Sequence, residues 1–100
     1  MPRTFTVEEE HTDEVVDHLA NYEGLEHVRA RRRADLLTLE SGPPNDAVPH
    51  TRFRRVGVHR WQIEMPLKGG GWDRTPWRGQ LLEVVGRVID EFPWMLAPRH

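Results

Sequence analysis

The sequence predicts an α+β domain in which an antiparallel meander sheet of four to six strands is covered on one face by two amphipathic helices. Residues 26–41 and 51–65 alternate apolar and polar side chains with period two, which is typical of half-buried strands. Residues 12–24 and 80–92 instead repeat apolar side chains with the spacing of a helix. The expected order of elements is β-α-β-β-β-β-(β)-α.

Size and composition allow one small core. A chain of 100 residues, of which 37% are hydrophobic and 30% charged, is expected to form a single globular domain over residues 1–100. No apolar run reaches the roughly 18 residues of a membrane helix, and the first residues lack the apolar core of a secretion signal. We therefore expect a cytoplasmic protein with no membrane partner. Lys68 is the single lysine among 14 basic residues, and this bias indicates GC-rich, bacterial coding.

A short strand and a helix are predicted for the first 24 residues from local sequence patterns. Residues 4–7 alternate and contain β-forming side chains, so they are expected to form a short first strand before the acidic run at residues 8–10. A helix is expected to follow, with Thr12 as its N-cap and an end at Gly24. Its apolar stripe consists of Val15, Val16, Leu19 and Tyr22.

Two hairpins and an edge strand are expected to make the meander. The first hairpin turns at Ala34 and Asp35, and the second covers residues 51–65 and turns near residues 56–58. The breaker residues 42–46 between them predict a loop. Residues 72–77 are expected to form an edge strand, since proline is tolerated at an edge, although Thr75 followed by proline also suits a helix start.

The second helix and the tryptophans are expected to complete the core. Four residues of the helix, Leu81, Val85, Val88 and Ile89, are predicted to pack against Leu39, Phe53, Trp61 and Ile63 of the sheet. A helical pair between Glu83 and Arg87 is expected on its outer face. Pro93 ends the helix, and residues 94–96 are expected to fold back on the core. Of the tryptophans at 72, 77 and 94, at least two are expected to be buried there.

Arginines dominate the face of the sheet that the helices leave open. If Val28, Leu37, Phe53 and Trp61 face the helices, alternation directs six arginines to the other side. These are Arg29, Arg31, Arg33, Arg52, Arg54 and Arg60. Their guanidinium forks suit carboxylates and phosphates, but like charges on adjacent strands repel unless acids separate them. Glu40, Glu64 and Asp35 are available for that, so a solvated face of ion pairs is the competing interpretation.

Aromatic and acidic residues extend the binding hypothesis. Trp72 and Trp77, beside Arg74, would act as interface anchors if they are exposed, because tryptophan and arginine dominate binding hot spots. Residues 1–26 carry a net charge of −7 and residues 27–60 a net charge of +5. The acidic first helix is therefore expected to disfavour nucleic acid and to suit the arginines of a second copy in a homo-oligomer.

Motifs for catalysis, cofactors or metals are not recognised. Ser41 lacks the flanking glycines of a hydrolase elbow, the six histidines form no metal-binding spacing, and residues 69–71 lack the continuation of a phosphate loop. We therefore predict no cofactor, no metal and no catalytic residue. A small enzyme with a carboxylate or histidine base stays open if a pocket gathers His50 or His59 with Glu64.

The function predicted from these patterns is a non-enzymatic protein-binding or regulatory domain whose arginine-rich sheet face contacts an acidic partner. The alternative is a nucleic-acid-binding module that uses the same arginines with tryptophan stacking. A heparin-column salt profile would separate the two.

Overall fold

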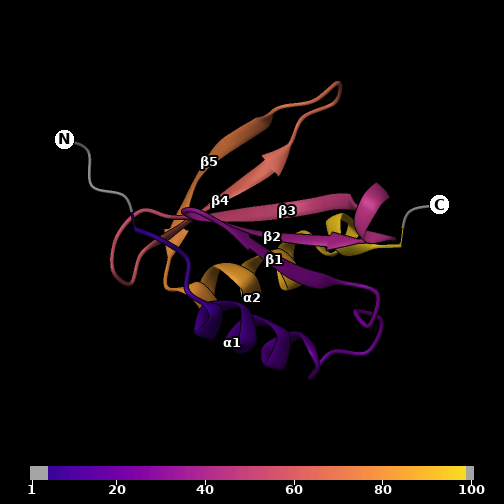
Figure 1. The fold of residues 1–100 in the computed structure, drawn as a ribbon, viewed down its shortest axis with the longest axis horizontal. Coiled ribbons are helices and arrows are strands. Elements are labelled where there is room, and N and C mark those ends of the chain that lie inside the picture. The colour runs from indigo at the N-terminus through magenta and orange to yellow at the C-terminus, as the bar shows by residue number, and fades with distance from the viewer. Residues whose placement is uncertain (1–4, 99–100) are drawn as a thin grey trace.

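The computed structural model describes residues 5–98 as a five-stranded antiparallel meander with both α-helices on one side of the sheet, and the α+β prediction is confirmed (Figure 1). The strands lie in the order β1-β2-β3-β4-β5. In chain order the elements are α1 (Glu9–Leu19), β1 (Arg29–Arg33), β2 (Leu36–Ser41), the 3-10 helix η1 (Pro44–Asp46), β3 (Val48–Arg55), β4 (Trp61–Pro66), β5 (Trp72–Gly79), α2 (Leu81–Glu91) and the 3-10 helix η2 (Pro93–Leu96).

The strand expected at residues 4–7 is wrong over its described part. Residues 5–8 are not in a strand, and Thr4 lies outside the described residues. Val7 is buried, and its N–H donates to the carbonyl of Ala34 in the β1–β2 turn at 2.8 Å. The segment therefore packs against a turn rather than along a neighbouring strand, so it has no ladder of backbone bonds to make it a strand.

The N-cap of helix α1 lies four residues before the expected N-cap at Thr12. Glu8 is the N-cap, and its N–H donates to Nδ1 of His11 at 2.9 Å in a capping box. Thr12 lies inside the first turn and donates its hydroxyl to the carbonyl of Glu9 at 2.6 Å. The prediction missed this start because a glutamate and a histidine make the box, where serine or threonine with glutamate is usual. The helix ends at Leu19, before the expected end at residue 24.

The meander follows the predicted hairpins. A two-residue turn at Ala34 and Asp35, with Ala34 at φ 54°, joins β1 to β2. Strand β3 begins at Val48, before the expected residue 51, and pairs with β2 through a register shift between Leu39 and Glu40. Strand β5 is an edge strand that contains proline, as predicted.

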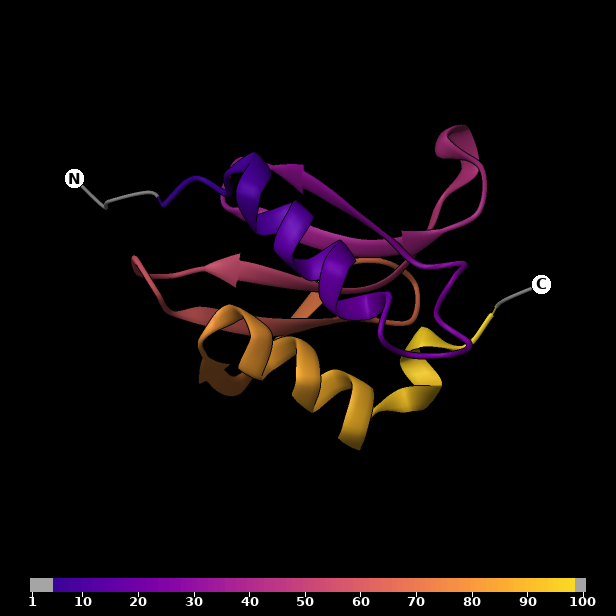
Figure 2. The same cartoon turned by 90° about the horizontal axis from the view of Figure 1, so that it is seen from below.

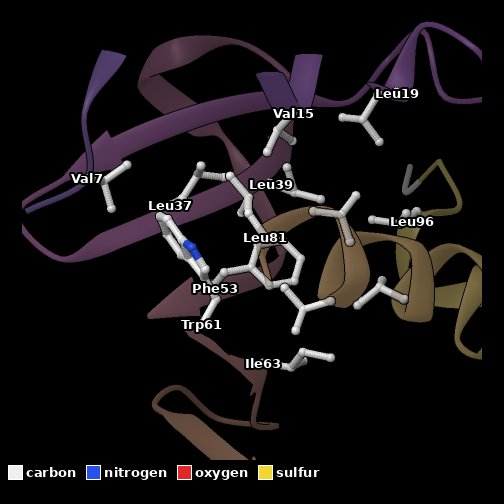
Figure 3. Packing of buried hydrophobic residues seen from close by; sticks show 13 residues of the cluster. Val7, Val15, Leu19, Leu37, Leu39, Phe53, Trp61, Ile63, Leu81 and Leu96 are labelled. Atoms are coloured by element: carbon white, nitrogen blue, oxygen red, sulfur yellow. The ribbon is translucent and has the colours of Figure 1, made fainter. Parts of the chain in front are cut away.

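The core lies between the sheet and the helices, which run side by side beneath it (Figure 2). The predicted partners of α2 are found there: three of its four named residues are buried, and Ile89 is partly buried against the same cluster. Figure 3 shows Phe53 and Trp61 of the sheet beside Leu81 of α2. The cluster consists of Val7, Val15, Leu19, Leu37, Leu39, Phe53, Trp61, Ile63, Leu81, Val84, Val85, Val88 and Leu96.

Two expectations are wrong, one about burial of the tryptophans and one about an ion pair on the outer face of α2. Of the three further tryptophans, Trp77 alone packs against the core cluster, while Trp94 is 65% exposed. Met95 and Leu96 cover the core in its place, because the short helix η2 turns these two side chains inward. The Glu83–Arg87 pair is also absent from the contacts of α2, since Glu83 accepts the N–H of Gln80 at 2.9 Å and Arg87 pairs with Glu91 at 2.9 Å.

Within residues 5–98, neither helix combines the length and apolarity needed to cross a bilayer.

Candidate functional site

The arginine-rich surface is the face of the sheet opposite the helices, here called the open face. Strand register places six arginines on it, because each pairs with Leu36, Thr38, Glu40 or Glu64, which alternate with the core residues. Trp72 lies on the same face, in contact with Arg52. The set is Arg29, Arg31, Arg33, Arg52, Arg54, Trp72 and Arg74. The five arginines of β1 and β3 therefore lie on the face that alternation predicted.

Glu64 is the centre of the first ion-pair cluster on this face. Its side chain is fully buried, and its two carboxylate oxygens accept Nε of Arg52 at 2.7 Å and Nε of Arg54 at 2.6 Å. Arg74 lies further away, with its Nε 3.7 Å from the carboxylate. Arg54 also reaches Asp35 in the β1–β2 turn at 2.9 Å. This cluster joins β3, β4 and β5, so it holds the sheet together as well as charging its surface.

The arginines keep Glu64 ionised. Burial alone would raise the pKa of Glu64, but the hydrogen bonds from Arg54 and Arg52 and the attraction of their charges outweigh burial and lower the pKa below its usual range. The carboxylate is therefore charged at neutral pH and is a weaker proton acceptor than an ordinary glutamate.

Glu40 is the centre of a second, more open cluster. Its carboxylate accepts Nε of Arg31 at 3.1 Å, and Nε of Arg29 lies at 3.7 Å. Arg29 also donates a terminal nitrogen to the carbonyl of Gly42. The Arg31 side chain is 57% exposed, against 18% for Arg52 in the first cluster. The arginines of β1 are thus available to solvent, while those of β3 are committed to the fold.

A groove runs across the open face between the η1 loop and the β4–β5 hairpin, both of which rise from this side of the sheet in Figure 1. Its volume is about 600 Å³. Arg31, Arg33 and Arg52 contribute its cations, and Trp72 contributes the aromatic side chain. The other lining residues are Leu36, Thr38, Glu40, Pro44, Asn45, Asp46, Ala47 and Pro49. The η1 wall was missed from the sequence, where residues 42–46 read only as a loop.

Trp72 is half-buried on the groove and is covered by an arginine. The guanidinium carbon of Arg52 lies 4.3 Å from the centre of the Trp72 ring, which is a cation–π contact. Because this contact occupies one face of the ring, the indole serves to position Arg52 rather than to offer both faces for stacking.

Two predicted site residues lie elsewhere. Arg60 is in the β3–β4 turn and lines a hollow with His59, Gln80 and Glu83 at the start of α2, because the turn breaks the alternation before β4 begins. Trp77 packs on Phe92 with ring centres 5.0 Å apart, against the helix side of the sheet. The prediction that Arg60 belongs to the arginine face is wrong, and Trp77 is partly buried against the core rather than exposed as an interface anchor requires.

The residues suggested for an enzyme are not gathered in one pocket. Glu64 lies on the open face, whereas His59 lines hollows beside the first turn of α2. His50 is buried at the other end of β3, where its Nε2 and the Ser41 hydroxyl share a hydrogen bond of 2.7 Å. No motif in the sequence predicts this Ser41–His50 pair, which depends on the β2–β3 register. Both partners are buried, so the pair ties β2 to β3.

Comparisons with protein-family models, curated proteins and solved structures find no match to this chain. Across residues 5–98, no group of three or more histidine, aspartate or glutamate side chains is placed to hold a metal ion.

Proposed function

We propose that this chain is a non-enzymatic protein-binding or regulatory domain whose open face binds an acidic partner in the bacterial cytoplasm. The observation that carries the proposal is the exposed pair Arg31 and Arg33 on a groove that Arg52 also lines. The described carboxylate contact of Arg31 uses Nε, which leaves the terminal nitrogens of its fork for carboxylates of a partner.

The open face has an excess of positive charge after its internal ion pairs are counted. Five of the six arginines share three carboxylates, those of Asp35, Glu40 and Glu64, and the ion pairs described within residues 5–98 do not include Arg33. A face on which every charge is paired would attract a charged partner only weakly. This face keeps an excess of positive charge, which is complementary to an acidic surface.

An acidic protein is favoured over nucleic acid by the aromatic residues. Strand binding without sequence preference uses aromatic rings on which bases stack. On this face one side of the Trp72 ring is covered by Arg52, and Trp77 lies on the helix side. The acidic residues of α1 add a repulsive charge to the same small domain.

The positions of α1 and the open face determine what kind of homo-oligomer their opposite charges could form. Helix α1 and the open face lie on opposite sides of the sheet (Figures 1 and 2). A contact between the α1 of one copy and the open face of another would therefore be head-to-tail, which produces rings or filaments rather than a two-fold dimer. A separate acidic partner is the simpler occupant.

The first test reverses charge at the exposed arginines. Arg31→Glu combined with Arg33→Glu is expected to retain the circular dichroism spectrum and to lose at least tenfold in affinity for a fluorescent oligoglutamate peptide, because two partner-facing cations become anions. Arg54→Glu is unsuitable for this purpose, since Arg54 bonds the buried Glu64. The matched control is Arg32→Glu with Arg60→Glu, which changes the net charge equally at exposed positions off the open face. Equal loss in both double variants would refute the proposal.

A salt series with a labelled single-stranded oligonucleotide tests the alternative. We expect an affinity no tighter than the ~10⁻⁴ to 10⁻⁶ M of non-specific contact. Six neutralised phosphates would instead give a slope of log affinity against log salt near −4, at about −0.7 per phosphate. Fluorescence anisotropy measures both quantities. Submicromolar binding at physiological salt with that slope would make nucleic acid the partner.

A further inference from the structure

Strand β1 is an edge of the sheet whose outer backbone groups are unpaired among the described residues. The two-residue turn closes on the pair Arg33 and Leu36, and such a turn joins a hydrogen-bonded pair. Alternation then directs the N–H and C=O groups of Arg29, Arg31 and Arg33 toward β2 and those of Ala30 and Arg32 outward. No backbone hydrogen bond within residues 5–98 reaches these outward groups. The edge can therefore accept another strand.

The opposite edge is less suited to this role. Strand β5 contains Pro76, which has no N–H to donate, and its pairing with β4 is irregular between Gln62 and Glu64. An added strand would meet an interrupted row of donors there. In β1 the five residues pair with β2 in unbroken register. Strand addition is thus expected at β1.

The side chains of β1 select the chemistry of the added strand. Arg29, Arg31 and Arg33 stand at alternate positions on the open face, beside the groove. A second copy of this chain that paired through β1 would set these arginines against their equivalents, and like charges on neighbouring strands are destabilising. An extended segment with a carboxylate at every second residue would instead place each acid beside an arginine.

We propose that the acidic partner binds as an extended strand that adds antiparallel to β1, with alternate Asp or Glu side chains on the open face. This inference rests on the proposed function, and it adds the conformation of the bound segment. Backbone bonds to Ala30 and Arg32 would hold the strand in register, and the arginines of β1 would read its charge pattern. A charged and short edge also resists pairing with other chains, so the same residues give selectivity for acidic strands.

Two methylated isomers of one peptide test the added strand. The probe is a fluorescent, end-capped peptide of four Glu-Thr repeats. In the proposed pairing the glutamates lie opposite the arginines on the open face, and the threonines lie opposite Ala30 and Arg32 with their N–H groups toward β1. Methylating two threonine amides removes those donors, whereas methylating two glutamate amides alters groups that point away. The isomers have the same charge and composition.

We expect the threonine-methylated isomer to bind the unaltered protein about tenfold more weakly than the glutamate-methylated isomer, since it lacks two hydrogen bonds. Equal affinities of the two isomers would overturn strand addition and leave an acidic partner bound through charge alone. If the unmethylated peptide does not bind at all, the proposed function fails as well. The three results are distinguishable in one anisotropy titration.

Discussion

Glu64→Gln is expected to lower the free energy of unfolding by about 3 kcal/mol, although glutamine has nearly the same volume. Removing one member of a buried ion pair leaves the other charges without a partner, which costs roughly 3 to 5 kcal/mol. The lower value applies because Arg52 and Arg54 remain 18% and 21% exposed and so keep some hydration. At roughly 4 to 8 °C per kcal/mol, the midpoint of a thermal melt should fall by about 12 to 24 °C.

Glu40→Gln is the matched control for this prediction. Its carboxylate is also covered, but its partners Arg29 and Arg31 are 39% and 57% exposed and can return to water. The expected loss is therefore about 1 kcal/mol, in the range of exposed pairs. Equal losses in the two variants would show that the Glu64 cluster contributes no more than an ordinary surface ion pair.

Glu64→Gln should also change how the free energy of unfolding depends on pH. The pKa of Glu64 in the folded protein lies below its ordinary value of 4.5, so its ion pairs contribute their full stability above that pH. That contribution is lost as the pH falls through the lowered pKa, because the unfolded chain binds the proton first. Urea titrations from pH 7 to pH 3 should show the difference between the wild type and Glu64→Gln shrinking below about pH 4.5.

The sheet and the open face could be predicted because both depend on alternation. In β2 and β3, residues such as Leu37 and Phe53 fix the buried face, and the arginines between them must then lie opposite. The same rule failed at Arg60, since the turn before β4 interrupts the extended backbone and sends that side chain toward α2. Alternation with period two therefore predicts which face a side chain lies on only within the strand itself.

The alternation of apolar and polar residues could not predict that a charged side chain, Glu64, is buried. Glu64 occupies an open-face position and was expected to offset the arginines from solvent, yet it is fully buried. Its burial follows from the hairpin of β4 and β5 and from the arginines that fold over it, which are long-range features. The same holds for the η1 wall of the groove, whose position depends on the β2–β3 register rather than on the composition of the loop.

Phe53→Ala is expected to be the most damaging single substitution, because it removes a fully buried ring from the middle strand of the sheet. Truncating a buried phenylalanine to alanine costs about 3 to 5 kcal/mol, as lost apolar burial and as the cavity that neighbours such as Ile63 and Val88 cannot refill. Domains of this size are stable by roughly 5 to 15 kcal/mol, so the variant should be only marginally folded. Val58→Ala, at a position that is 56% exposed in the β3–β4 turn, is the control and should leave the urea midpoint nearly unchanged. A Phe53→Ala protein with the wild-type midpoint would mean that the helices do not pack on this strand, and the layered core of the fold would have to be abandoned.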